Sequence, residues 1–410
     1  MRLPLSRGVL ALLILAVSPG SCSFAPPQVF KNVNLLRTFD LTRPYVKETT
    51  AVIVENVSQE PQSDYFIPFP KDSVPKVSWI GARDKKGGLG DFEIKLVEPS
   101  LNDDDRWGRP SITKGPWFDL KYRSSANVYY HITFPKPLQP SKSYTIQIIA
   151  ILTSALSPVP AEIAQNEEQF LRYSSPKYAL SAYPVEKQKT KFRFPSPDID
   201  SFTKFPDSPD GTEDPQKLGN SLTYGPYSSI SKDAGVKDIV LRYDFTQPIV
   251  HANKLQRDIE VSHWGGNLAT EEKYWITNAG AKLKDHFSRV TWTSRSYYNS
   301  PSAALKQLTF PLQQGSSDVY YTDEIGNVTT SHFRSNAREA HLELKPRFPL
   351  MGGWNYSFTI GWNNDLGRYL KQKDTGGDIY FLKVPFMQGP TDTISYDEVE
   401  IRVILPEGAM

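Results

Sequence analysis

Strict alternation of apolar and polar residues is the feature that most restricts the fold of this chain. Segments 91–97 (DFEIKLV) and 398–405 (EVEIRVIL) place apolar side chains at every second position. Successive side chains of a strand point to opposite faces, so this period predicts antiparallel strands with one buried face. Pro-rich joints at 135–137 and 158–160 end such strands, because proline cannot donate to a ladder. The chain is therefore predicted to be mostly β, built from sandwiches, with short helices expected only near 161–168 and 366–372.

A faint internal repeat predicts two tandem domains that arose by duplication. The matching segments are 35–41 with 255–261, 144–148 with 356–360, and 191–195 with 400–403. The first match is followed in each half by an expected strand that ends in Asn56 or Asn278. The common order and an offset of about 210 residues favour duplication over chance.

The stretch between the halves is rich in Pro, Ser, Asp and Gly. Residues 198–216 are expected to form a mobile loop. The boundary is placed near Gly235, which gives a first β domain over residues 24–235 and a second over 236–410.

Residues 1–23 have the layout of a signal peptide: Arg2 and Arg7, then an apolar run at 9–17, then small polar residues up to the only cysteine, Cys22. The full chain has 47 basic and 45 acidic residues, so loss of these two arginines leaves equal numbers. A neutral surface argues against nucleic-acid binding. With a single thiol, no intrachain disulfide can form, and stability depends on the core.

No later run is apolar enough to cross a bilayer, so the chain as given is expected to be soluble in the lumen of a secretory compartment. The sequence stops at residues 404–410, directly after a strand-like run. This position suggests a truncated polypeptide.

A search for catalytic chemistry finds no motif. The six histidines form no His-Glu-x-x-His, and there is neither a Gly-x-Ser-x-Gly elbow nor a phosphate-binding Gly-x-x-x-x-Gly-Lys. The acidic run 103–105 contains an Asp-x-Asp of the kind that holds a divalent metal, but a solvated turn is the favoured interpretation. No catalytic residue, metal site or cofactor is therefore predicted.

Three sequons are candidate N-glycosylation sites. Asn327 ranks first, because it follows Gly326 in an expected tight turn within YTDEIGNVTTSHF. Asn56 ranks second and Asn355, at the start of an expected strand, ranks last.

Several long strings resemble the ribophorin I family. They are IEVSHWGGN (259–267), GAKLKDHFSRV (280–290), VYYTDEIGNVTTSH (319–332), PRFPLMGGW (346–354) and ILPEGA (404–409). Weaker matches in the first half are TTAVIVENVS, PAEIAQNEEQF and YGPY. The resemblance covers almost all of the chain after residue 23 and is strongest in the second half.

The resemblance implies a non-catalytic subunit of the endoplasmic-reticulum oligosaccharyltransferase, which moves a dolichol-linked oligosaccharide to Asn in Asn-x-Ser/Thr of nascent proteins. The family's lumenal β domains precede a single membrane span, which would lie beyond the present C-terminus. The implied partners are the other subunits, including the catalytic one, whose Trp-Trp-Asp-Tyr-Gly motif does not occur here, and nascent polypeptides.

Two alternatives remain open at this point. One is a stand-alone secreted β-sandwich that binds carbohydrate or peptide, for which scattered tryptophans such as Trp264 and Trp354 could supply stacking surfaces. The other is a lumenal hydrolase with an unrecognised site, which would require titratable groups that converge in a deep pocket.

Overall fold

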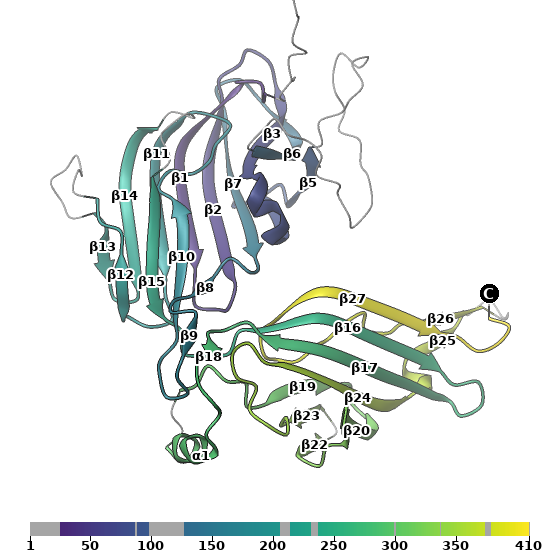
Figure 1. Ribbon diagram of the computed structural model, residues 1–410. Helices are drawn as coiled ribbons and strands as arrows, with labels where there is room; N and C mark the ends of the chain where they lie inside the picture. The colour runs from purple at the N-terminus through teal and green to yellow at the C-terminus, as the bar shows by residue number, and fades with distance from the viewer. Residues whose placement is uncertain are drawn as a thin grey trace, which may run out of the picture.

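The computed structural model describes residues 25–86, 88–97, 127–205, 214–230, 237–298, 301–336, 338–373 and 379–409. Strands dominate these residues, which confirms the predicted mostly-β class. The predicted signal peptide, residues 1–23, and the acidic run 103–105 lie outside them. Figure 1 shows two β modules, with the first standing on one end of the second and its strands running steeply across those below.

The first module has two layers. Its large sheet has the order β13-β14-β11-β1-β2-β7-β4-β5-β6-β3, and its small sheet has the order β12-β15-β10-β8. The large-sheet strands are β1 (Phe30–Asp40), β2 (Val46–Asn56), β3 (Gln62–Pro70), β4 (Val77–Asp84), β5 (Asp91–Val97), β6 (Asn127–Leu138), β7 (Ser143–Leu152), β11 (Val185–Arg193), β13 (Gln216–Leu218) and β14 (Ser221–Ile230). The small-sheet strands are β8 (Ser157–Pro158), β10 (Phe170–Pro176), β12 (Ile199–Phe202) and β15 (Asp238–Asp244), and a 3₁₀ turn, η1 (Lys71–Lys76), follows β3.

Aromatic side chains join these two layers. Phe39 of β1 stacks on Phe192 of β11 with ring centroids 4.9 Å apart, and Tyr173 of β10 lies 5.6 Å from Phe39. Phe194 meets Tyr243 of β15 at 5.2 Å. All five side chains are buried, so the alternating apolar residues of the sequence form one core between the sheets.

The second module repeats this plan with fewer strands. Its main sheet has the order β21-β20-β24-β17-β16-β27, covered by a three-stranded sheet, β19-β23-β22, and a two-stranded ribbon, β25-β26. The strands are β16 (Val250–Val261), β17 (Asn267–Asn278), β19 (Leu308–Leu312), β20 (Ser317–Asp323), β21 (Gly326–Asn327), β22 (Ser331–Ser335), β23 (Ala340–Leu344), β24 (Asn355–Asp365), β25 (Leu370–Gln372), β26 (Tyr380–Leu382) and β27 (Ile394–Ile404). The helical elements are α1 (Arg289–Tyr297) and a 3₁₀ turn, η2 (Leu366–Arg368).

Strand pairing shows that the repeat extends to register, and it corrects the third sequence match by two residues, because Phe192 is equivalent to Val403 and not to Ile401. β1 is antiparallel to β2 and parallel to β11, and β16 has the same relation to β17 and β27. Residue 32 pairs with 54 and 185, while residue 252 pairs with 276 and 396. A bulge follows residue 32 in one copy and residue 252 in the other. The same topology, register and irregularity in both modules support duplication.

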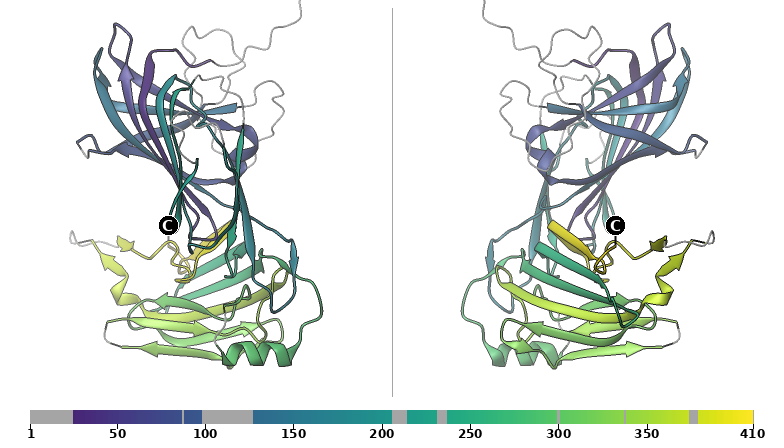
Figure 2. Two further views of the ribbon diagram at one scale, coloured as in Figure 1. Left: turned by 90° about the vertical axis from the view of Figure 1, so that its left-hand side faces the viewer. Right: turned by 90° about the vertical axis from the view of Figure 1, so that its right-hand side faces the viewer.

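A short parallel ladder joins the modules. β9 (Glu162–Ile163) pairs with β18 (Lys282–Leu283). Figure 1 places this ladder between the two sandwiches, and Figure 2 shows the two modules one above the other from both sides. The fully buried Gln169 donates to the carbonyls of Phe245 and Gln247 and accepts from the Ala281 backbone N–H. Backbone and side-chain hydrogen bonds therefore connect the two modules directly.

Two local expectations differ from the structure, and one is confirmed. Residues 161–168 contain β9 and a turn instead of a helix, because Glu162 and Ile163 pair across the junction. The segment near 366–372 does contain a helical turn, η2, although α1 had no sequence prediction. Within the expected loop 198–216, residues 199–202 form β12, and 206–213 lie outside the described residues.

The strand β15, expected to open the second domain, packs in the first module. It pairs with β10, and its residues Ile239, Leu241 and Tyr243 are fully buried in the first core. The cores of the two modules meet between Phe245 and Val250, about ten residues after the expected boundary near 235.

Candidate functional site

The first strand of each module carries a buried arginine that joins the two layers. In the first module, Arg37 Nε donates to Glu48 Oε1 at 2.9 Å, and one terminal nitrogen donates to the Pro176 carbonyl at 3.2 Å. The guanidinium also lies 4.7 Å from the centroid of Phe39. Arg37 is only 7% exposed, so its charge is neutralised inside the sandwich.

In the second module, Arg257 occupies the equivalent place. It pairs with Glu272 and donates to the Pro385 carbonyl at 3.4 Å, while Trp362 lies over the guanidinium. Both ionised side chains are at most 4% exposed, and Tyr274 donates its hydroxyl to the second carboxylate oxygen at 2.7 Å. Burial raises the pKa of Glu272, whereas Arg257 and Tyr274 act in the opposite direction. These contacts fix the charged pair within the core.

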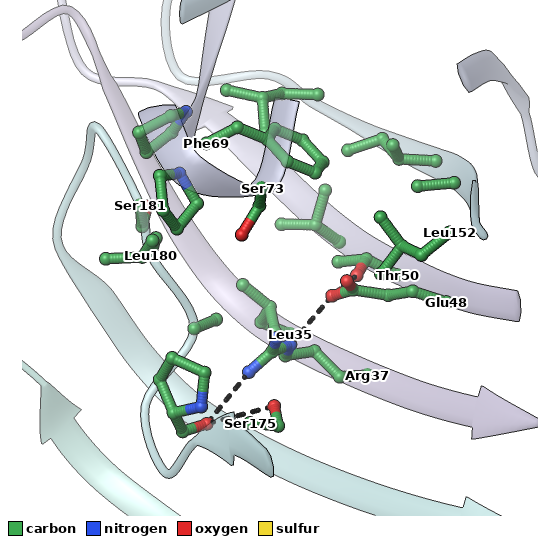
Figure 3. A pocket seen from close by; sticks show the side chains of 18 of the residues that line it. Leu35, Arg37, Glu48, Thr50, Phe69, Ser73, Leu152, Ser175, Leu180 and Ser181 are labelled. Carbon is green, nitrogen blue, oxygen red and sulfur yellow. Dashed lines mark hydrogen bonds and ion pairs between the residues drawn. The ribbon is translucent and has the colours of Figure 1, made fainter. Parts of the chain in front are cut away.

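A cavity of about 150 Å³ lies beside Arg37 in the first module. Figure 3 shows the Arg37–Glu48 pair at this cavity, with Phe69 and Ser73 among the other lining side chains. Its wall combines the inner faces of β1, β2 and β7 with the segment 174–181. Ligand pockets usually measure roughly 300–1,000 Å³, so this cavity is small for a substrate.

The residue that opens this cavity is Ala150. Its pairing partner in the ladder is Glu48, and in the second module the equivalent pair is Trp362 with Thr270. Ala150 lines the cavity, whereas Trp362 is 5% exposed and packs over Arg257. An indole therefore fills in the second module the position that a methyl group leaves open in the first.

Asn56, the second-ranked glycosylation candidate, is fully buried at the end of β2. Its side-chain nitrogen donates to the carbonyls of Glu60 and Leu138, both at 2.8 Å, and its oxygen accepts from the Ser58 backbone N–H. The amide nitrogen that a glycan would occupy is thus committed to the fold, and this geometry argues against the prediction for Asn56.

Asn278 makes equivalent hydrogen bonds at the end of β17. It is fully buried, donates to the carbonyls of Ala303 and Leu350, and accepts from the Gly280 backbone N–H. Asn278 is not in a sequon. The sequence repeat had matched Asn56 with Asn278. Because the second module has the asparagine without a sequon, this match was a signal in the sequence that Asn56 has a structural role.

The other two sequons are exposed. Asn327 lies in β21, just after a turn in which Asp323 accepts from the backbone N–H groups of Ile325 and Gly326, and Gly326 has a φ of 136°. Asn355 begins β24, and its side-chain oxygen accepts from the Thr277 hydroxyl at 2.7 Å. Modification of Asn327 and Asn355 stays a prediction.

The metal-site and tryptophan candidates of the sequence are not brought together in the described part of the chain. Within it, no three His, Cys, Asp or Glu side chains gather as metal ligands. Trp264 is 92% exposed at the tip of the β16–β17 hairpin, whereas Trp354 is half-buried beside Phe287 and Phe348. Among the described residues, no helix has the length and apolar character to cross a membrane.

Two copies of one sheet, each with a buried arginine–carboxylate pair, define a tandem β-sandwich protein whose charged interior groups serve packing. The chain belongs to the Ribophorin I family, whose model matches residues 30–410.

Named relatives match over nearly the whole chain. Dolichyl-diphosphooligosaccharide–protein glycosyltransferase subunit 1 of Schizosaccharomyces pombe is 32% identical over 98% of this chain and 81% of its own length. Subunit 1B of Arabidopsis thaliana is 30% identical over 98% and 79%. The Caenorhabditis elegans subunit 1 is 32% identical over 96% of this chain but 61% of its own length. Among solved structures, an M1 zinc metallopeptidase matches at a TM-score of 0.28 and 13% identity, over 58% of this chain and 50% of that one, which is too weak to support a functional comparison.

Proposed function

We propose that this chain is a subunit of an oligosaccharyltransferase, the complex that transfers a dolichol-linked oligosaccharide to asparagine in Asn-x-Ser/Thr of nascent proteins. The observation that carries this proposal is family membership across residues 30–410, with relatives that are named as subunit 1 of that transferase. The same match argues against the alternative of a stand-alone carbohydrate- or peptide-binding protein.

Within that complex, the role we propose is structural and non-catalytic. The buried arginines and glutamates contact each other and backbone carbonyls, so they are used to hold layers together. The cavity beside Arg37, at about 150 Å³, has the volume of a single large side chain and not of an oligosaccharide. Both features support a scaffold.

The proposed location is the lumenal side of the endoplasmic-reticulum membrane, with attachment through a span beyond residue 410. The proposed partners are the other transferase subunits, including the catalytic one, and nascent polypeptides that pass nearby. Exposed apolar side chains such as Trp264 and Phe386, which are 92% and 75% exposed, are candidate contact points.

The test is affinity purification of the tagged full-length protein from its own membranes under mild detergent. We expect the other subunits to co-purify and the eluate to glycosylate an acceptor peptide, whereas the chain separated from them should show no transfer. An unrelated lumenal glycoprotein with the same tag is the control. Recovery of the protein without transferase subunits would contradict the assignment, and transfer by the isolated chain would contradict the non-catalytic role.

A further inference from the structure

The two copies of the repeated sheet differ at one edge. In the first module, β11 lies between β1 and β14. In the second, the equivalent strand β27 pairs with β16, and it has no partner on its other side among the described residues. An edge of this kind presents backbone donors and acceptors that can accept another strand.

The two faces of β27 are chemically distinct. One face carries side chains that contact β16: Glu398 with Lys254 at 2.9 Å, and Arg402 with Asp258. The opposite face carries the apolar row Val399, Ile401, Val403 and Leu405. The first face is therefore suited to contact with solvent, and the second face is suited to burial under a packed layer.

The apolar row lacks the cover that its counterparts have. Phe192 of β11 and Phe194, just after it, are 0% exposed, because Tyr224 of β14 contacts Phe192 and Tyr243 of β15 contacts Phe194, with ring centroids 5.7 and 5.2 Å apart. The equivalent residues in β27 and just after it, Val403 and Leu405, are 48% and 50% exposed. These two side chains therefore lie where β14 and β15 would shield them.

The neighbouring ribbon shows the same deficit. β10 in the first module ends at Pro176, and β26 in the second ends three residues before Pro385; the carbonyls of these prolines accept from the buried arginines. In the first module, β15 pairs with β10, and Leu171 is 0% exposed. In β26, Tyr380 and Phe381 are 53% and 59% exposed. β26 thus has exposed apolar side chains, as β27 does. They lie at the position that β15 covers in the first module.

We propose that two further strands complete the second module: one antiparallel to β27, in the place of β14, and one on β26, in the place of β15. The occupant is the segment of the same polypeptide that follows residue 410. The first strand places an apolar side chain opposite Val403, as Leu222 lies opposite Phe192. The inference goes beyond the proposed function and does not depend on it.

The repeat, and not the position of the last residue, is what indicates a strand from the same chain. In the first module β14 and β15 follow β11 in sequence, so a duplicated unit has its equivalents after β27. The relatives are also longer than the matched part, since the match covers 81% of the Schizosaccharomyces pombe protein and 61% of the Caenorhabditis elegans protein.

Hydrogen exchange of the natural full-length polypeptide, compared with the chain that ends at Met410, tests the proposal. We expect the β27 backbone amides to exchange at least about tenfold more slowly in the longer polypeptide, because a paired edge opens only with its sheet. Peptides from β1 and β2 in the first module provide the control and should be unchanged. Equal exchange of β27 in both chains would overturn the proposal, and so would slowing that appears only when partner subunits are added.

A matched pair of variants gives an independent readout. Val403 and Ile404 have similar exposures here, 48% and 46%, but their counterparts are the buried Phe192 and the exposed Arg193. In the longer polypeptide, Val403→Glu should lower the Tm of the second module by roughly 5–10 °C, because it places a charge under the added layer, while Ile404→Glu should leave it unchanged. In the chain ending at Met410 both variants should be near neutral. Equal effects of the two variants in the longer polypeptide would refute the added layer.

Discussion

The two modules have the same sheet topology but differ in how side chains fill the space between their layers. At equivalent positions on β7 and β24, the first module has Ala150 and a cavity of about 150 Å³, and the second has Trp362 packed on Arg257. Register is under tight constraint, because a one-residue slip would turn every side chain to the other face. The interior volume of each module is under looser constraint, since one large residue can replace an open space.

The buried ion pair shows the same freedom on a smaller scale. Position 50 on β2 is equivalent to 272 on β17, and 48 is equivalent to 270. The first module has Thr50 and Glu48, whereas the second has Glu272 and Thr270. The glutamate thus differs in position by two residues between the modules, on the same face of the strand. In each module it pairs with the equivalent arginine. What the duplication preserves is the neutralised charge, and not the residue that supplies it.

The largest expected difference between the modules comes from removing these acids. Glu272→Ala leaves Arg257 buried without its carboxylate and should lower the free energy of unfolding by about 3–5 kcal/mol. Glu48→Ala should cost less, about 1–3 kcal/mol, because Arg37 lies beside a cavity that can hold water and keeps the Pro176 carbonyl. Denaturant unfolding, followed by hydrogen exchange of peptides from each module, measures both.

A double variant, Arg257→Met with Glu272→Leu, is the control for the ion-pair prediction. It removes both charges while keeping apolar volume, and its stability should lie near that of the wild type. Equal losses for Glu48→Ala and Glu272→Ala would show that the difference in burial between the two pairs does not set their contribution to stability.

The buried asparagines should behave alike in both modules. Asn56→Ala and Asn278→Ala each remove two side-chain hydrogen bonds to backbone carbonyls, of which the Glu60 and Leu350 carbonyls keep the Ser58 hydroxyl and the Leu305 N–H as donors, and each should cost about 2–3 kcal/mol. Asn355→Ala, at an exposed sequon, should stay within about 0.5 kcal/mol of the wild type. Thermal unfolding of the three variants measures these changes, and a neutral Asn56→Ala would show that its hydrogen bonds contribute nothing.

Glycopeptide mapping of protein from a secretory host sharpens the same point. Asn327 should carry a glycan, because its side chain is exposed next to a tight turn, and Asn56 should be unmodified. A glycan on Asn56 in the folded protein would be incompatible with its burial.

Filling the cavity should bring the first module closer to the second. Ala150→Leu adds apolar volume where space exists and should raise the free energy of unfolding by about 1 kcal/mol. Ala82→Leu is the matched control, since Ala82 is also buried but does not line the cavity, and overpacking there should cost about 1–3 kcal/mol. If both substitutions destabilise alike, the space beside Arg37 is not available for packing.

The smallest effect concerns acid sensitivity of the second module. Hydrogen bonds from the Arg347 guanidinium lower the pKa of Asp323 below its ordinary value of 3.8. A lowered folded-state pKa contributes stability that is present above the unfolded-state pKa and is lost as the pH falls through the folded value. Arg347→Gln should therefore flatten the loss of second-module stability below about pH 4. Denaturation midpoints from pH 2 to 7 would measure this, and an unchanged acid limb in the variant would exclude the pair as a contributor.

Much of this architecture could be predicted from the sequence. The period-two alternation gave the mostly-β class, and the match of Arg37 with Arg257 indicated the duplication that the ladders support. The strings shared with the ribophorin I family indicated the family. These features depend on local pattern, which a strand sequence carries directly.

The parts that could not be predicted depend on tertiary contacts. The local sequence does not show that Glu48 and Glu272 pair with equivalent arginines, because the two glutamates occupy different positions in the repeat. The segment 161–168 looked helical, yet pairing of β9 with β18 across the junction decides its conformation. β15 was assigned to the wrong side of the boundary, because only its pairing with β10 reveals which core it serves.

The junction between the modules has a mechanical consequence. Gln169 and the β9–β18 ladder tie the end of one sandwich to the start of the other with directional bonds in place of a slack tether. A force applied to the first module by a neighbouring protein is accordingly passed to the second through these hydrogen bonds.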